Sequence, residues 1–326
     1  MGIRRKRHAL DQLRRVRPEM ARQFASRALG DVGQAVAAHP QLRRHPVGHG
    51  LKPILRLHTS GDTAMRGLRK DMLNTVTYEN PTDQVPLLIA HGLFGSARNW
   101  GVIAKRLAET RPVHVVDMRN HGESPHLETH GYEDMAADLV HTIKGNSDVL
   151  GHSMGGKAAM VLSLTRPDLV RKLIVADIAP VAYGHTQMPL IQAMRDLDLK
   201  AVETRGDADR QLRATVDDPG VRAFLLQSLD VKNRRWRLNL DVLARDMDRI
   251  IGFPELEGAF DGPALFLTGA TSDYVRDEHR DRIRDLFPKA VFAKIPGAGH
   301  WLHADKPREF EAAVAAFLAH DHQAAS

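Results

Sequence analysis

From residue 73 onward, short apolar runs alternate with longer amphipathic segments. Six runs of strand length, rich in Val, Ile and Leu, occupy residues 86–90, 113–118, 148–153, 173–179, 264–268 and 290–295, and a strand-like stretch, LNTVTY, precedes them. Segments with the spacing of amphipathic helices occupy residues 98–109, 132–144, 155–165, 277–287 and 306–320. Buried strands that alternate with helices are typical of a parallel sheet covered on both faces. The pattern therefore predicts an α/β fold.

Residues 181–261 interrupt this alternation. They contain no clear strand, and helix-like stretches occupy residues 189–198, 207–216, 220–229 and 241–250. An insertion of this length between two strands is expected to cover the carboxyl edge of the sheet, where ligands bind in such folds. We therefore expect a core made of residues 72–180 and 262–326, with a helical cap at residues 181–261.

The sharpest local motif is Gly151-His152-Ser153-Met154-Gly155, directly after an apolar run and directly before a helical segment. A strand, a tight turn and a helix in this order form a nucleophile elbow, which holds its serine in a strained conformation. The flanking glycines avoid collisions there, and the amino end of the helix favours developing negative charge. The motif predicts Ser153 as a nucleophile; an ordinary strand-to-helix turn is the alternative.

A serine nucleophile needs a base within hydrogen-bond distance. The chain has 18 histidines, so a histidine alone says little, but His300 lies between the last strand run and the last helical segment. Gly297 and Gly299 allow its loop to bend back over the sheet edge, and the serine precedes the histidine as in hydrolases with such an elbow. We predict His300 as the base, with a surface-loop histidine as the alternative. His152 is predicted to be a pocket wall, because adjacent side chains diverge at a tight turn.

Acyl transfer also needs backbone N–H groups that face the developing oxyanion. The N–H of Met154, directly after the serine, is one expected donor. The second should come from residues 91–95 (HGLFG), which follow an early apolar run. Leu93 is the preferred donor in this loop, and Phe94 is the alternative.

Several segments closely resemble a group of small α/β-hydrolase esterases: HGLFGSARNWGVIAKRL, VDMRNHGES, DVLGHSMGGKAAM, VADIAPVAY and IPGAGHWLHADKP. This group includes bacterial acyl-ester and acyl-CoA thioesterases and related mitochondrial abhydrolase-domain proteins. The resemblance runs from about Leu73 to about Leu318 and leaves out residues 1–71. It implies an α/β-hydrolase fold, a mostly parallel central sheet flanked by helices, with the cap inserted before the last two strands.

Two aspartates compete as the acid that orients His300. Asp273 follows the apolar run at 264–268, but the usual acid position there is occupied by Ser272. Asp177 ends the run LIVAD, where a buried carboxylate is costly unless a partner such as an imidazolium compensates it. The resemblance to the esterase group also implies that the acid comes from the DIxP segment. We therefore prefer Asp177 and keep Asp273 as the alternative.

The predicted activity is hydrolysis of acyl esters or thioesters through an acyl-enzyme on Ser153, without a metal or other cofactor. The resemblance implies short to medium acyl chains, with CoA thioesters among the candidates. A cofactor-free perhydrolase or C–C bond hydrolase would use the same residues, and a non-catalytic binding protein would keep the fold. The side chains expected to line the substrate pocket are His91, Phe94, Trp100, His152, Tyr183, His185, Tyr274 and Trp301.

Charge is divided unevenly along the chain. Residues 1–71 hold 16 Lys and Arg against 5 Asp and Glu, whereas the remainder holds 30 against 35. We therefore expect no nucleic-acid partner for the folded body, and a solvated helix end explains its short basic run, residues 234–237 (RRWR). The absence of cysteine excludes disulfides and thiolate chemistry. No apolar stretch is long enough for a membrane span.

The basic segment 1–71 has three interpretations. It is a transit peptide, a basic arm for nucleic acid or anionic lipid, or sequence upstream of the true start. We favour the last, with Met72 or Met65 as the functional start, and expect the segment to be poorly ordered or non-native. The expected location is cytoplasmic, or the mitochondrial matrix if the segment is a transit peptide; the sequence does not give the oligomeric state.

Overall fold

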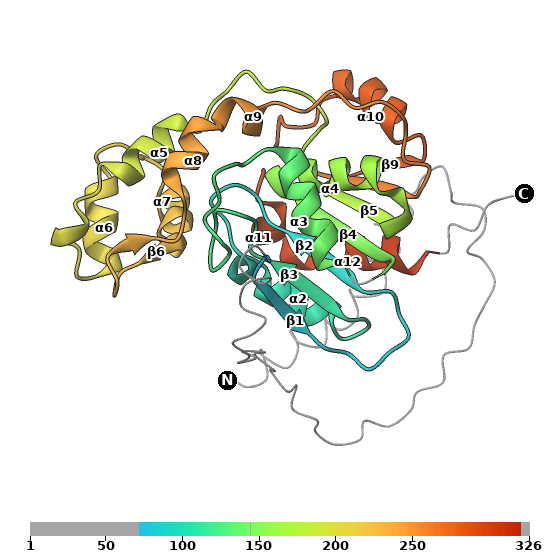
Figure 1. The fold of residues 1–326 in the computed structure, drawn as a ribbon, viewed down its shortest axis with the longest axis horizontal. Coiled ribbons are helices and arrows are strands. Elements are labelled where there is room, and N and C mark those ends of the chain that lie inside the picture. Colours follow the sequence, from blue (N-terminus) through green and yellow to red (C-terminus); the bar gives the residue numbers. More distant parts are fainter. Residues whose placement is uncertain (1–71, 144, 321–326) are drawn as a thin grey trace, which may run out of the picture.

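Seven strands form one sheet in the computed structural model, which describes residues 72–143 and 145–320 (Figure 1). The strands are β1 (Thr75–Tyr78), β2 (Leu87–Ala90), β3 (Val113–Val116), β4 (Ser147–His152), β5 (Val170–Ala176), β8 (Ala264–Gly269) and β9 (Ala290–Ile295). Their order across the sheet is β1-β3-β2-β4-β5-β8-β9. Only the β1–β3 pair within this sheet is antiparallel. The predicted mostly parallel sheet is confirmed; residues 1–71 lie outside the described ranges.

Helices cover both faces of this sheet. One face carries α3 (Tyr132–Thr142), α4 (Met154–Thr165) and α10 (Arg280–Leu286), and the other carries α2 (Gly101–Leu107), α11 (Leu302–Asp305) and α12 (Pro307–Ala319). Alternate strand residues face the two layers: in β2, Leu88 packs with the first and Ile89 with the second. Burial on both faces explains why these strands are continuous apolar runs rather than alternating ones.

The strands β4 and β5 end before the apolar runs that predicted them, and each ends one residue before a polar side chain of its run. β4 ends at His152 and β5 at Ala176, so Ser153 and Asp177 are the first residues beyond them. Their N–H groups still bond the neighbouring strand, Ser153 to the carbonyl of Ala176 (3.0 Å) and Asp177 to that of Leu267 (2.9 Å). Both side chains therefore start from firmly held backbone at the carboxyl edge of the sheet.

Residues 181–261, the predicted cap, contain mostly short helices. They hold α5 (Met188–Arg195), α6 (Arg205–Leu212), α7 (Pro219–Leu225), α8 (Leu240–Arg245) and α9 (Met247–Ile251), with a two-stranded ribbon of β6 (Leu229–Asp230) and β7 (Arg235–Trp236). The expectation of no strand here was wrong, because strands of two residues are too short to show a period. The basic run at residues 234–237 accordingly lies on this ribbon and not at a helix end.

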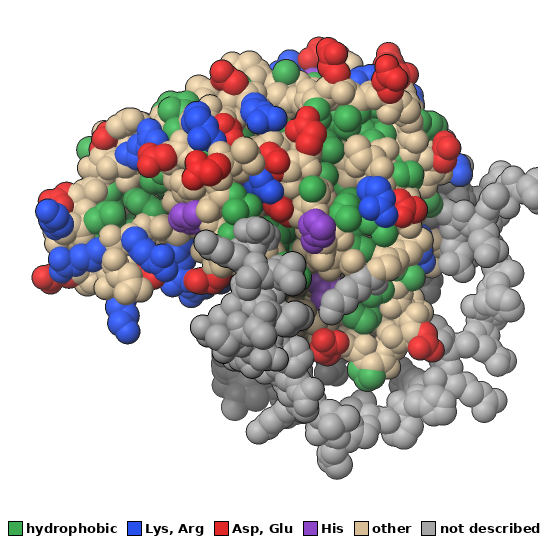
Figure 2. Space-filling view, in the orientation of Figure 1, with side chains coloured by type: hydrophobic (Ala, Val, Ile, Leu, Met, Phe, Trp, Pro, Cys, Tyr) green, Lys and Arg blue, Asp and Glu red, His purple; other side chains and the backbone are tan. Residues whose placement is uncertain are grey.

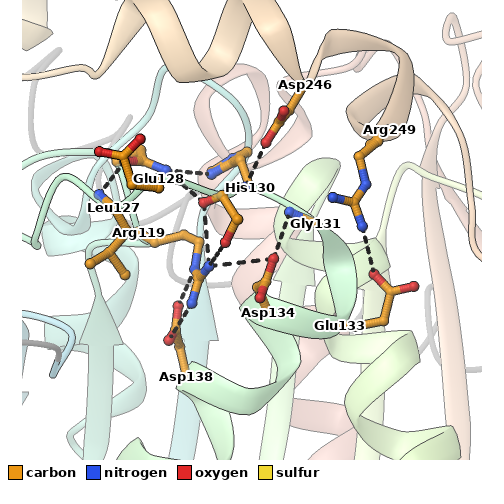
Figure 3. Close-up of polar contacts among 12 residues, drawn as sticks. Arg119, Leu127, Glu128, His130, Gly131, Glu133, Asp134, Asp138, Asp246 and Arg249 are labelled. Atoms are coloured by element: carbon orange, nitrogen blue, oxygen red, sulfur yellow. Dashed lines mark hydrogen bonds and ion pairs between the residues drawn. The ribbon is translucent and has the colours of Figure 1, made fainter.

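The cap is attached to the core through a polar network beside α3 (Figure 3). Asp246 of the cap accepts the backbone N–H of His130 (2.8 Å), and Arg249 pairs with Glu133 (3.8 Å). Below them, Arg119 forms two hydrogen bonds with Asp138, at 2.6 and 2.8 Å. The loop that leads into α3 is thus held from the core and from the cap.

A second attachment is made by Lys157, a fully buried residue of α4. Its ammonium donates to the carbonyls of Val181 (2.8 Å), Ile251 (2.9 Å) and Gly252 (2.5 Å). The first carbonyl lies where the chain enters the cap and the other two where α9 ends. One side chain therefore binds both connections of the cap to the helix that follows Ser153.

The surface carries charges of both signs. On the face drawn in Figure 2, Lys and Arg side chains of the described residues lie among Asp and Glu side chains. This mixture differs from the one-sign stripe that binding to nucleic acid requires. No helix within residues 72–143 and 145–320 has both the length and the apolar character needed to cross a membrane.

Candidate active site

Ser153 lies at the tight turn between β4 and α4. Its backbone angles, φ 52° and ψ −120°, are in a region that residues with a side chain rarely occupy. A Cβ atom at Gly151 would lie 2.2 Å from the carbonyl oxygen of Gly155, and one at Gly155 would lie 2.4 Å from that of Ala90. Both glycines are therefore required for the strand and helix to approach so closely.

Three side chains form one hydrogen-bonded line at this turn. The Nε2 atom of His300 lies 3.1 Å from the Oγ atom of Ser153, and its Nδ1 atom lies 2.7 Å from Oδ2 of Asp177. The carboxylate of Asp177 can only accept from Nδ1–H, which leaves the lone pair of Nε2 for the serine hydroxyl. The arrangement is the one that allows His300 to take a proton from Ser153.

The carboxylate of Asp177 is completely buried, and its hydrogen bonds compensate for the loss of water. Oδ1 accepts from the N–H of Gly269 (3.0 Å), and Oδ2 accepts from the hydroxyl of Ser272 as well as from His300. Sequence reasoning noted that Ser272 occupies the usual acid position but missed what it does. Its hydroxyl donates to the carboxylate of Asp177, which follows the neighbouring strand.

The ring of His300 is also held by contacts outside this line. Tyr274 stacks on it with ring centres 3.8 Å apart and planes 16° apart. The hydroxyl of Tyr183 donates to the carbonyl of Tyr274 (2.7 Å) and accepts the N–H of Ala179 (2.9 Å). His152 donates from Nε2 to the carbonyl of His300 (2.8 Å), and burial lowers its pKa well below the ordinary value, so it stays neutral. His152 is thus a wall of the site that also fixes the backbone of His300.

The loop at residues 91–95 directs one backbone N–H toward the site. The carbonyl of Gly92 accepts from the N–H of Gly95 (3.0 Å) and from Nδ1–H of His91 (2.8 Å). In a trans peptide the carbonyl and the following N–H point in opposite directions. The N–H of Leu93 therefore points away from both donors, and Leu93 lines the same cavity as Ser153.

Met154 offers a second backbone N–H. It is the first residue of α4, so its N–H has no acceptor within the helix. It directly follows Ser153 and also lines the cavity. Leu93 and Met154 are therefore the candidate donors to an oxyanion beside Ser153.

A cavity of about 440 Å³ lies above these groups, between the sheet edge and the cap. All the side chains predicted to line a pocket do line it: His91, Phe94, Trp100, His152, Tyr183, His185, Tyr274 and Trp301. Sequence reasoning did not name the apolar and basic lining residues Tyr132, Lys157, Ile178, Leu190, Val221, Phe224, Ile250 and Ile251. Several of these residues lie on the apolar faces of the cap helices. The sequence shows the apolar spacing along these helices, but it does not show which way each apolar face points.

Among the described residues, no group of three or more His, Asp or Glu side chains is arranged to hold a metal ion. The polar groups beside the elbow are a hydroxyl, an imidazole, a carboxylate and backbone amides, the set that acyl transfer uses.

Comparison with known proteins gives the family. Residues 87–313 match the sequence profile described as the alpha/beta hydrolase family. The chain belongs to the alpha/beta hydrolase family. The resemblance to esterases of this family, inferred from the elbow, the two loops and the histidine segment, is confirmed by named relatives.

Three known proteins that are similar to this alpha/beta hydrolase are a lipase and two esterases. The sn-1-specific diacylglycerol lipase ABHD11 of Danio rerio is 39% identical over 279 residues, 81% of this chain and 88% of the relative. Esterase YbfF of Escherichia coli is 38% identical over 248 residues, 74% of this chain and 96% of the relative. A solved structure of a marine microorganism esterase superposes with a TM-score of 0.72 at 38% identity, covering 76% of this chain and 99% of that one.

Two alternatives left open by the sequence do not fit the geometry of this alpha/beta hydrolase. Asp273 is exposed, and Asp177 already occupies Nδ1 of His300. The N–H of Phe94 donates to Nε2 of His121 (3.1 Å) and so is not free for an oxyanion. Asp177 and Leu93 are the candidates that the contacts favour.

Replacing the two aspartates separately tests the acid. Asp177→Asn should lower kcat by about 10⁴-fold, because an amide does not hold His300 in the required tautomer. The exposed Asp273→Asn is the matched control and should keep nearly full turnover. Steady-state kinetics with a p-nitrophenyl ester, together with circular dichroism to verify folding, gives the comparison. The reverse pattern would transfer the role to Asp273.

His303 gives the site a pH-dependent contribution to stability. Its ring stacks on Trp100 with centres 4.2 Å apart, and its Nδ1 atom has no hydrogen-bond partner among the described residues. Burial lowers its pKa to about 3. Between pH 6.5 and 3 the unfolded chain therefore binds a proton that the folded chain excludes, and stability falls as the pH falls.

His303→Phe keeps an aromatic ring on Trp100 and removes the titrating group. We expect the free energy of unfolding to depend less steeply on pH between pH 6 and 4, by up to about 1.4 kcal/mol per pH unit. Urea denaturation of both proteins at a series of pH values measures this slope. An unchanged slope would show that His303 is protonated as readily in the folded chain as in the unfolded one.

Proposed function

We propose that this alpha/beta hydrolase cleaves carboxylic esters or thioesters of short to medium acyl chains through an acyl-enzyme on Ser153. The observation that carries the proposal is the line from Asp177 through His300 to the hydroxyl of Ser153, at 2.7 and 3.1 Å. Ser153 lines a cavity that Leu93 and Met154 also line. Relatives named as a diacylglycerol lipase and an esterase support an ester as the substrate.

The proposed reaction has two steps, the acylation and the deacylation of Ser153. Oγ of Ser153 attacks the substrate carbonyl while Nε2 of His300 takes its proton, and Asp177 stabilises the imidazolium. The N–H groups of Leu93 and Met154 stabilise the oxyanion of the tetrahedral intermediate. The intermediate collapses, His300 returns the proton to the leaving alcohol or thiol, and the acyl group stays on Ser153. Water, deprotonated by His300, then releases the acid and restores the hydroxyl.

The lining of the cavity favours an uncharged acyl group. Of the described residues that line it, Lys157 is the single Lys or Arg, and three backbone carbonyls accept from its ammonium. Burial also lowers the pKa of Lys157 to about 7, so part of the population carries no charge at neutral pH. Asp305, in turn, would repel a substrate anion. A carboxylate on the acyl chain would therefore lose water without gaining a counter-charge.

An activity-based probe tests the nucleophile. A fluorophosphonate should label the wild-type protein, and Ser153→Ala should abolish labelling and lower kcat by about 10⁴-fold or more. Ser163→Ala is the matched control, because Ser163 is a buried serine of α4, the helix that follows Ser153, and its hydroxyl donates to the carbonyl of Met160; this variant should keep the labelling and turnover of the wild type. Folded wild-type protein that resists the probe would instead favour a binding function.

Two esters of similar length test the acyl preference. We expect kcat/KM for p-nitrophenyl butyrate to exceed that for the p-nitrophenyl monoester of succinate by at least about 10-fold, because the free carboxylate has no partner in the cavity. Butyryl-CoA, assayed beside them by thiol release, compares thioester with ester for one acyl group. Equal or faster cleavage of the succinate monoester would contradict an uncharged acyl site.

A further inference from the structure

Phe94, in the loop that carries Leu93, is held at both of its polar backbone atoms. Its N–H donates to Nε2 of His121 (3.1 Å), and its carbonyl accepts from the hydroxyl of Ser228 (2.9 Å). Its φ of 63° lies in the left-handed region, which a residue with a large side chain occupies only when surrounding contacts require it. These two hydrogen bonds are contacts of that kind.

The two partners come from different parts of the molecule. His121 belongs to the turn after β3, whereas Ser228 ends a short 3-10 helix of the cap, Leu226–Ser228. Both side chains are buried, and neither belongs to the lining of the cavity. Both bind the backbone of Phe94, and the ring of His121 also lies beside that of His91, with ring centres 5.2 Å apart.

His121 is suited to act as a permanent acceptor. Its Nδ1 atom donates to the carbonyl of Arg119 (2.8 Å), which places the proton on Nδ1 and leaves Nε2 to accept from Phe94. Burial lowers the pKa of His121 well below the ordinary value, so the ring is neutral at neutral pH. The N–H of Phe94 is consequently held in the direction of His121.

The N–H of Phe94 and the carbonyl of Leu93 share one planar peptide, so the hydrogen bond to His121 fixes the peptide plane that follows the Cα atom of Leu93. If either bond to Phe94 were lost, its backbone could relax out of the left-handed region and turn this peptide. The backbone of Leu93 would move with it, and the N–H of Leu93, in the preceding peptide, would be displaced from the substrate carbonyl oxygen on which negative charge develops. An oxyanion hole is sensitive to such changes, because its donors must face the place where charge develops.

We propose that His121 and Ser228 are positioning residues that hold the oxyanion loop in its active shape by binding the two backbone polar atoms of Phe94. The cap thus takes part in forming the oxyanion hole as well as in enclosing the substrate. The inference rests on the proposed ester hydrolysis, in which Leu93 supplies one oxyanion donor.

Two pairs of variants separate this role from general damage. Ser228→Ala removes the donor to Phe94, and Ser163→Ala is its control, a buried serine that also donates to a backbone carbonyl. His121→Met replaces the acceptor by a thioether, which accepts only weakly, while His121→Gln keeps a strong one, because the amide oxygen can take the place of Nε2. If His121→Met does not fold, the Ser228 pair and His121→Gln still decide the question.

The readout compares binding of the transition state with binding of the ground state. An alkyl trifluoromethyl ketone forms a tetrahedral adduct with the serine and uses the oxyanion hole, whereas the methyl ether of the same chain length only fills the cavity. For Ser228→Ala and His121→Met, kcat/KM and the affinity for the trifluoromethyl ketone should fall together by about 10- to 100-fold. Affinity for the ether should stay within about twofold, as expected when only transition-state stabilisation is lost. His121→Gln should lose less than His121→Met.

Three outcomes would overturn the inference. Affinity for the ether and the ketone falls by the same factor, neither affinity falls, or Ser163→Ala behaves like Ser228→Ala. A failure of the proposed function looks different, because the wild-type protein would then show no hydrolysis dependent on Ser153. Thermal denaturation of each variant verifies that the affinities describe folded protein.

Discussion

A carboxylate that is cut off from water must have its charge and its lone pairs satisfied by the protein. Asp177 meets this condition with one backbone N–H, one hydroxyl and one imidazole, supplied by Gly269, Ser272 and His300. Gly269 and Ser272 lie at the end of β8 and in the loop directly after it, and His300 lies in the loop after β9. The acid therefore holds together three neighbouring strand ends, and the direction of His300 toward Ser153 depends on that junction.

Much of this arrangement could be predicted from the sequence, because its signals are local. Buried parallel strands are continuous apolar runs, and the elbow motif has a mechanical cause in the two close contacts at Gly151 and Gly155. The position of Asp177 was predictable because a carboxylate inside an apolar run needs a partner. In each case the residues that carry the signal lie within one turn of the feature that they indicate.

What the sequence did not reveal depends on contacts between distant segments. Ser272 and Asp177 are 95 residues apart, and Ser228 and Phe94 are 134 apart. A serine has the same appearance in a sequence whether it faces solvent or donates to a buried acceptor. The left-handed conformation of Phe94 was equally hidden, because nothing in a phenylalanine indicates it. Such roles emerge only when the fold brings the partners together.

The cap leaves and rejoins the core at nearly the same point. Tyr183, near its start, donates from its N–H to the carbonyl of Ile251, near its end (3.0 Å), and Lys157 binds backbone on both sides of this junction. A segment whose two ends meet can be lengthened, shortened or exchanged without moving the strands beneath it. The core can therefore accept a different cap at this junction without moving the strand ends that carry Ser153 and Asp177, provided that the new cap again supplies the hydrogen bond that Ser228 donates to Phe94.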